Sequence, residues 1–414
     1  MRSALRLRLA VGSLLILVST TVGAEPITLD DALRRAANRP AVEIARLEVD
    51  ATRAFARQAG RRPYSPELSL AVGPRLGGGE TLLDAQVMLA QTFELGGKGS
   101  ARRAVADAEV EVAASEVAVV SHAARVDTWR VFQLALLARE RLATAQEAEA
   151  LAIQVDQATR ERQTLGAATQ LEANLTTAEL GRARHDRLDA ERRNDAAIAA
   201  LATAIGAGAD EALEPVGVLE VPPDVTTGPA ALRTTALEDR ADLRVARSTV
   251  TLAQREAHAF EASRSPDLTV GLSYGFEQDP GASAHVVSLS ASLGLPLGTR
   301  NQGARDAARV RERRAELEVT RVTTEISREV TVAIGSYQKT REAVLGFDRE
   351  VNEHLHENLE LARESFASGK IDYYEFNVVR RELIANRLAY LDAFAEAIDA
   401  RSILDLVTGG GVTP

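Results

Sequence analysis

The chain has 414 residues, a formal net charge of −10 at pH 7, 4% aromatic residues and no cysteine. Its acidic balance argues against nucleic acid as a partner and is compatible with cationic cargo. The lack of cysteine excludes disulfides, thiolate metal ligands, cysteine catalysis and an N-terminal lipidated cysteine. Alanine, leucine, glutamate and arginine are abundant, which is typical of long helices rather than of a compact globule.

The first 24 residues have the pattern of a secretory signal peptide. Arginines at positions 2, 6 and 8 precede an apolar run over residues 9–18, and Val22-Gly23-Ala24 fits a small-residue cleavage site. A transmembrane anchor is the alternative, but a helix needs roughly 20 apolar residues to span a bilayer. We therefore expect residues 1–24 to be removed and the mature protein to be exported without a lipid anchor.

The chain repeats itself at a distance of about 200 residues. Residues 39–46 resemble residues 240–247, residues 66–70 resemble residues 266–270, and Gly166 corresponds to Gly369. We expect a first repeat over residues 25–210, a linker over 211–230, a second repeat over 231–408 and a tail over 409–414.

Each repeat contains two segments in which apolar residues alternate with small or polar ones. They are expected to be strands at residues 67–73 and 84–94, and at residues 266–277 and 285–295, with residues 73–83 as a glycine-rich loop. This pattern is typical of outer-membrane β-barrels, although one such hairpin alone is equally expected at the edge of a soluble sheet. Tyr64, Phe93, Tyr274 and Phe276 lie near the strand ends and are candidates for an interfacial aromatic girdle.

Long helices follow each pair of strands. Residues 100–163 contain neither proline nor glycine, so they predict one helix about 100 Å long at 1.5 Å per residue. Small and apolar residues recur along it in steps of four and three, which indicates a coiled-coil seam. The seam comprises Ala101, Val105, Ala108, Val112, Ser115, Val119, His122, Val126 and Trp129. A similar stripe from Val319 to Phe366 predicts a second long helix, and return helices are expected over residues 169–205 and 372–407.

Four strands cannot close a transmembrane barrel, because the smallest such barrels have about eight. Open strand edges do not survive in lipid, where each unpaired backbone group costs several kcal/mol. Three chains would pool twelve strands and twelve helical columns. The expected fold is therefore mainly α with a transmembrane β portion: a trimeric 12-stranded β-barrel that is continuous with a long α-helical barrel enclosing a water-filled tunnel.

The doubled plan and several short segments resemble the TolC-type outer-membrane factor family over essentially the whole mature chain. These segments are residues 27–33 and the hairpin tips at Gly166 and Gly369. Residues 91–98 and 295–304 are similar to the strand-to-helix junctions of the CzcC-like heavy-metal efflux branch. The resemblance implies a homotrimer in the outer membrane, with the helical barrel extending into the periplasm. It also implies a periplasmic adaptor (membrane fusion protein) and an inner-membrane transporter of the RND type as partners.

The resemblance further implies roles for residues at the two hairpin tips. Family members close the periplasmic tip through rings of acidic residues, and the matching positions make Asp372, Glu375 and Glu172 candidates for the pore constriction. The alternative is that Asp372 caps its helix and that both glutamates are solvated. Candidates for adaptor contact at the tips are Leu165, Gly166, Ala167, Ser368, Gly369 and Lys370.

The sequence contains no motif for catalysis, a cofactor or a resident metal. Gly97-Lys98-Gly99-Ser100 lacks the spacing of a phosphate loop, and His354 and His356 are two residues apart, so they point to different sides of a helix. The predicted function is an exit duct of a tripartite efflux system for heavy-metal cations. The alternatives are an exit duct for drugs or secreted polypeptides, and a soluble periplasmic coiled-coil adaptor or scaffold.

Overall fold

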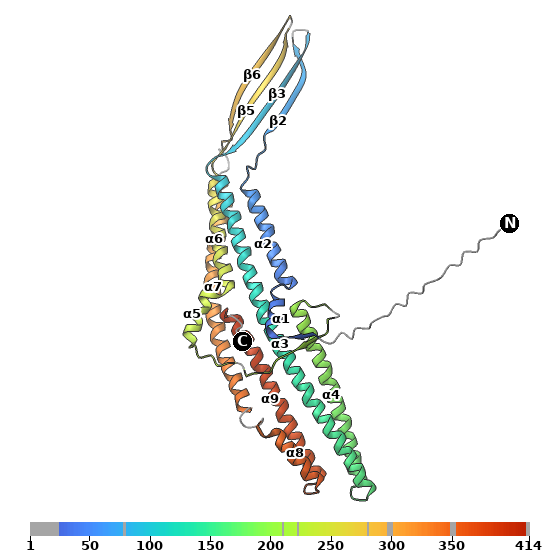
Figure 1. Cartoon of the computed structure of the whole chain (residues 1–414). Coiled ribbons are helices and arrows are strands. Elements are labelled where there is room, and N and C mark those ends of the chain that lie inside the picture. Colours follow the sequence, from blue (N-terminus) through green and yellow to red (C-terminus); the bar gives the residue numbers. More distant parts are fainter. Residues whose placement is uncertain are drawn as a thin grey trace, which may run out of the picture.

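The computed structural model of the chain is a long rod with a sheet at one end and two helical tips at the other (Figure 1). The structure describes residues 25–77, 80–208, 211–221, 223–279, 281–295, 301–347 and 353–410. The expected signal peptide at residues 1–24 and most of the expected tail at 409–414 lie outside these residues.

Helices form most of the rod. They are α1 (Leu29–Ala36), α2 (Pro40–Ala59), α3 (Lys98–Thr164), α4 (Gln170–Ile205), α5 (Pro229–Asp239), α6 (Ala241–Ala262), α7 (Gln302–Phe347), α8 (Glu353–Ala367) and α9 (Tyr373–Thr408). Among the described residues, no helix is both long and apolar enough to span a bilayer.

The first long helix is confirmed, and the second is described in two parts. Helix α3 runs unbroken for 67 residues, and its length follows from the absence of proline throughout and of glycine after Gly99. The second helix, expected to continue through residue 366, consists of α7 and α8 in the described part of the chain. Helix α7 packs on α5, α6 and α9, whereas α8 packs mainly on α9 and also meets α3 through Phe366 and Val155.

The strands form two sheets. A short parallel pair joins β1 (Glu25–Ile27) to β4 (Leu213–Pro215), and a four-stranded antiparallel sheet has the order β2-β3-β5-β6. The strands of the larger sheet are β2 (Glu67–Gly77), β3 (Glu80–Glu94), β5 (Asp267–Asp279) and β6 (Ala282–Leu293).

The larger sheet extends further from the helices than the sequence pattern suggests. Residues 73–83 were expected to be a loop, yet β2 continues to Gly77 and β3 begins at Glu80. The two strands stay paired from Gly73, which lies opposite Asp84, to Gly77, which lies opposite Glu80. The glycines in this segment therefore do not end the pairing. The second hairpin is likewise tight, with Gly281 at a φ of +86° between the strands.

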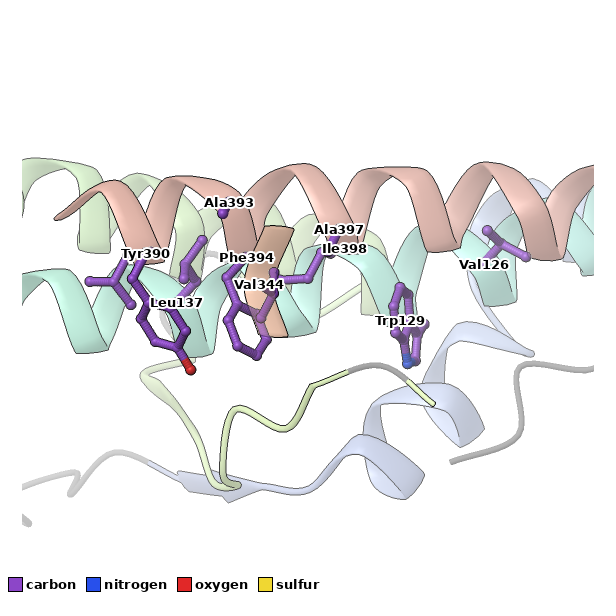
Figure 2. Close-up of a cluster of buried hydrophobic side chains, with 10 residues drawn as sticks. Val126, Trp129, Leu137, Val344, Tyr390, Ala393, Phe394, Ala397 and Ile398 are labelled. Atoms are coloured by element: carbon purple, nitrogen blue, oxygen red, sulfur yellow. The ribbon is translucent and has the colours of Figure 1, made fainter. Parts of the chain in front are cut away.

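The apolar core lies in the middle of the rod, where α3 crosses α9. Trp129 and Leu137 of α3 lie beside Phe394 and Ile398 of α9, with Val344 of α7 against them (Figure 2). A second cluster surrounds Tyr337 of α7, which is completely buried and donates its hydroxyl to the backbone carbonyl of Pro223. The chain between the two repeats is therefore packed against the rod rather than free of it.

Candidate functional site

The four-stranded sheet presents one apolar face to its surroundings. Directly opposite residues of antiparallel strands point to the same face, so cross-strand pairs form rows. Two successive rows are Leu68-Leu89-Leu272-Leu289 and Leu70-Val87-Tyr274-Val287. These eight side chains are 43–78% exposed. The face is therefore not covered by helices of its own chain, and it is available to lipid or to a partner.

The opposite face of the sheet is small and more polar. Its rows include Ser69-Met88-Ser273-Ser288 and Ala71-Gln86-Gly275-Val286. The alternation expected from the sequence is thus present in the folded strands, and it gives the sheet one apolar and one polar side.

The two outer strands leave backbone groups unpaired. Strand β2 pairs with β3 and strand β6 pairs with β5, and neither has a second neighbour among the described strands. A sheet edge of this length is a template for pairing with another chain.

Aromatic side chains lie near both ends of the sheet. Phe93 is close to the helices, where the guanidinium of Arg62 lies 5.7 Å from its ring centroid. Tyr274 and Phe276 lie toward the far end, where both rings contact His285 and the Tyr274 hydroxyl lies 2.7 Å from its Nδ1. This distribution is compatible with the expected girdle at two levels.

Two ion pairs tie the sheet to the long helix. Glu94 and Asp267 face each other across β3 and β5, an arrangement of like charges that is destabilising without cations. Lys98 Nζ donates to Asp267 Oδ1 at 2.8 Å, and Arg102 Nη1 donates to Glu94 Oε1 at 2.5 Å. Lys98 therefore neutralises a strand carboxylate at the first turn of α3.

The two helical tips are built in the same way, residue for residue. Gly166 and Gly369 have φ values of +74° and +71°, a left-handed conformation that favours glycine. In each tip the next residue closes the helix end: the Ala167 amide donates to the Arg162 carbonyl and the Lys370 amide to the Ser365 carbonyl, both at 2.8 Å. The tip side chains of Leu165, Ser368 and Lys370 are exposed, Leu165 by 82%.

The three candidate constriction carboxylates take part in helix caps. Glu172 Oε2 accepts from the Thr169 amide at 2.6 Å, and the Thr169 hydroxyl accepts from the Glu172 amide in return. Asp372 Oδ1 accepts from the Glu375 amide at 2.8 Å, and Glu375 Oε2 accepts from the Asp372 amide. The capping alternative for Asp372 is confirmed, and both glutamates complete capping boxes, Glu375 while exposed and Glu172 while half-buried. The constriction role stays a prediction.

A buried carboxylate joins α3 to α4 above the first tip. Asp156 is 5% exposed and accepts hydrogen bonds from Arg160 Nε at 2.7 Å and from the hydroxyls of Thr176 and Thr177 at 2.9 Å. Burial alone would raise the pKa of Asp156, but these three donors outweigh burial and hold its pKa below the usual range.

A buried cation joins the two hairpins to each other. Arg380 of α9 is 4% exposed and forms an ion pair with Glu179 of α4, which also accepts from Arg182 at 2.6 Å. Beside it, Phe366, Tyr373 and Phe376 pack on Val155 of α3. The two tips are therefore connected through polar and apolar contacts a few turns from their ends.

Sequence reasoning missed Asp156 and Arg380. The available signal was a charged side chain interrupting an apolar stripe, since Asp156 follows Val155 and Arg380 lies four residues after Phe376. Charged residues are rarely buried unless they are paired. Such an interruption could have indicated a paired site, although not its partner.

The described residues contain no group of three or more His, Asp or Glu side chains placed to hold a metal ion. The side chains of His354 and His356 lie outside the part of the chain that the structure describes.

Comparison with known proteins shows what the chain is similar to. Residues 232–410 match the family model described as outer membrane efflux protein. Over 96% of its length the chain is 25% identical to the cobalt-zinc-cadmium resistance protein CzcC of Cupriavidus metallidurans, of which it covers 94%. The second repeat therefore resembles outer membrane efflux proteins in sequence, and a weaker similarity to CzcC extends over nearly the whole chain.

Solved structures of two proteins, CusC and VceC, share the fold over nearly their whole length. The structure of CusC is similar with a TM-score of 0.74 and 18% identity, over 92% of each chain. The outer membrane protein VceC of Vibrio cholerae is similar with a TM-score of 0.72 and 19% identity, over 93% of this chain and 97% of that one. The helical rod and the four-stranded sheet thus have the arrangement found in CusC and VceC.

Removing the Asp156 charge tests whether the buried network stabilises the protein. We expect Asp156→Asn to lower the free energy of unfolding by about 2 kcal/mol at pH 7, because a hydrogen-bonded buried charge is lost. The depressed pKa means that the stabilisation is present above the unfolded-state pKa of about 4 and is lost as the pH falls below it.

Urea unfolding followed by helical circular dichroism at pH 7 and pH 3 measures both effects. Asp107→Asn is the control, since Asp107 is an exposed carboxylate on the same helix. Equal stability of the two variants at pH 7 would show that the Asp156 network contributes nothing.

Proposed function

We propose that the chain is the outer-membrane exit duct of a tripartite efflux system that exports heavy-metal cations. In this proposal three chains assemble into a homotrimer, their sheets close a 12-stranded barrel in the lipid, and their helices continue it into the periplasm. A periplasmic adaptor and an inner-membrane RND transporter supply cargo and energy, and the duct itself needs no catalytic residue.

The observation that carries the proposal is the sheet with one bare apolar face and two open edges. Lipid would cover the apolar face, and neighbouring copies would pair the edges, which an apolar medium requires. Three chains with four strands each give twelve strands, which is an even number within the range of known transmembrane barrels. A soluble scaffold is disfavoured, because its hairpins would pack on its own helices and these eight side chains would be covered.

The metal cargo is supported by the similarity to the cobalt-zinc-cadmium resistance protein over nearly the whole of both chains. The acidic balance of the chain favours cations in a narrow water-filled tunnel. A duct for drugs or secreted polypeptides has the same walls and differs in the transporter attached.

The acidic residues at the tips suggest where the cargo enters the duct. We place Glu172, Glu375 and Asp372 at the periplasmic constriction, where three symmetry copies of each carboxylate would attract cations. The exposed tip residues Leu165, Gly166, Ala167, Ser368, Gly369 and Lys370 would then meet the adaptor.

A lysine on the apolar face of the sheet tests membrane insertion. We expect Leu289→Lys to abolish the outer-membrane trimer, because a lysine facing lipid near the bilayer centre costs about 2–4 kcal/mol per chain. Ser288→Lys is the matched control on the polar face of the same strand and should leave the trimer intact. Membrane fractionation and gels of unheated and heated samples measure both, and equal behaviour of the two variants would contradict the proposal.

A deletion strain tests the cargo. We expect loss of the gene to increase sensitivity to cobalt, zinc or cadmium, and the wild-type chain expressed from a plasmid to restore growth. Growth inhibition at graded metal and drug concentrations measures this. Increased sensitivity to drugs alone would make the cargo assignment wrong and leave the duct in place.

Neutralising the tip glutamates tests the constriction. We expect the double variant Glu172→Gln and Glu375→Gln to lower the potassium-to-chloride permeability ratio of the channel in planar bilayers, because the rings of charge are lost. Glutamine still completes a capping box, so the tips should keep their fold. Glu161→Gln, an exposed position near the tip of α3, is the control. An unchanged ratio in the double variant would remove these residues from the constriction.

A further inference from the structure

The turn between α2 and β2, at the base of the first strand hairpin, carries arginines without acidic partners (Figure 1). Arg61 and Arg62 lie in this turn, and both are exposed. Arg103 of α3 is also exposed and lies against the turn, since a Cβ on Gly60 would stand 3.6 Å from Arg103 Cδ. Within the described part of the chain, none of the three arginines pairs with a carboxylate.

The second strand hairpin has a carboxylate at the equivalent place. Helices α2 and α6 end in the same way, because the Arg61 amide donates to the Gln58 carbonyl at 2.9 Å and the Arg264 amide to the Glu261 carbonyl at 3.2 Å. Glu261 therefore corresponds to Gln58, and Arg264 corresponds to Arg61.

Glu261 gathers the arginines around it. Arg305 Nε and Arg309 Nη2 each lie 2.9 Å from Glu261 Oε1, and Arg264 Nη1 lies 3.7 Å from Oε2. The guanidinium of Arg305 holds the pKa of Glu261 below its usual range. This carboxylate thus balances the cations at the base of the second hairpin.

The arginines recur in the first repeat, but the carboxylate does not. An offset of 202 residues relates α3 to α7, because it superposes buried alanines of the two helices, Ala106 on Ala308 and Ala113 on Ala315. The same offset matches Arg103 with Arg305. The first repeat therefore keeps two of the arginines and has the neutral amide of Gln58 in place of the carboxylate, so a position for an anion is left open.

The turn that carries these arginines is fixed by hydrogen bonds. Arg102 donates to the backbone carbonyls of Ala59 and Arg61, both at 3.0 Å. Gln91 Nε2 donates to the Tyr64 carbonyl at 3.1 Å. The backbone that presents the cations is therefore held to α3 and to β3.

The open anion position adjoins the apolar face of the sheet. The Arg62 guanidinium lies 5.7 Å from the ring centroid of Phe93, which is four residues after Leu89 on β3 and so points to the same face. Leu68, directly opposite Leu89, is 74% exposed. In the proposed duct lipid chains cover this face, so the arginines stand at the level of the headgroups of the leaflet nearest to the helical rod.

We propose that Arg61, Arg62 and Arg103 bind the phosphate of an anionic phospholipid in that leaflet. Guanidinium groups match phosphate oxygens with paired hydrogen bonds, and the acyl chains of such a lipid would extend past Phe93 along the apolar face. The net charge of the chain is −10, so the attraction comes from this patch and not from the overall charge. The inference rests on the proposed duct and names the lipid class that its sheet-to-helix junction selects.

Supplying the missing carboxylate tests this site. We expect Gln58→Glu to bind the nearby arginines as Glu261 does, and to lower the retention of phosphatidylglycerol by the purified full-length trimer about fivefold. Native mass spectrometry from mixed micelles of phosphatidylglycerol and phosphatidylcholine counts the retained lipids. Gln146→Glu is the matched control, because it adds the same charge at an exposed position of α3 far from the sheet and should retain lipid as the wild type does.

Removing the cations tests the same site in a second way. We expect the double variant Arg61→Gln and Arg103→Gln to lose phosphatidylglycerol at least as strongly as Gln58→Glu. Arg264→Gln is its control, since this arginine already has a carboxylate partner. Excess inorganic phosphate should not displace the lipid from the wild type, because the acyl chains contribute to binding.

The outcomes separate this inference from the proposed function. Preferential retention of phosphatidylglycerol by the wild type, lost in both test variants and kept in both controls, supports the lipid site. A trimer in which either test variant retains as much lipid as the wild type would overturn the site and leave the duct standing. Displacement by inorganic phosphate would indicate a soluble anion and overturn the lipid assignment. A wild-type protein that stays monomeric and outside the membrane would overturn both the site and the duct.

Discussion

The structure depends on the hydrogen bonding of four strands that a single chain leaves incomplete. Strands β2 and β6 each have one neighbour, while the apolar rows across the sheet require a non-aqueous surrounding. In lipid these two demands conflict for a single chain, because unpaired backbone groups there cost several kcal/mol each. In the proposed assembly, sharing of edges among copies would resolve the conflict and would also determine where the helical columns stand.

The repeat supplies the material for such sharing. Each half contributes a hairpin of strands and a hairpin of helices. The two tips are equivalent in detail, because the left-handed glycine, the helix-closing amide and the capping box recur with an offset of 203 residues. The buried pair Arg380 and Glu179 and the stacked aromatics beside Val155 hold the two hairpins of one chain together near the tips.

Much of this fold could be predicted from sequence because its signals are local and periodic. The helix from Lys98 to Thr164 follows from an unbroken run of helix-forming residues, and the tip turns follow from Gly166 and Gly369. Features that depend on distant partners could not be read in this way. The pairing of β1 with β4 and the burial of Asp156 arise from residues far apart in the chain or on a facing helix. The candidate carboxylates at the tips were found through resemblance, and their caps could be expected from the spacing of Thr169 with Glu172 and of Asp372 with Glu375.

Backbone hydrogen exchange of the edge strands tests closure by sharing most directly. In protein extracted from membranes, peptides covering β2 and β6 should exchange as slowly as those covering β3 and β5, because neighbouring copies pair the outward amides. Rapid exchange of about half of the amides in β2 and β6, alongside slow exchange in β3 and β5, would show open edges and contradict assembly through the sheet.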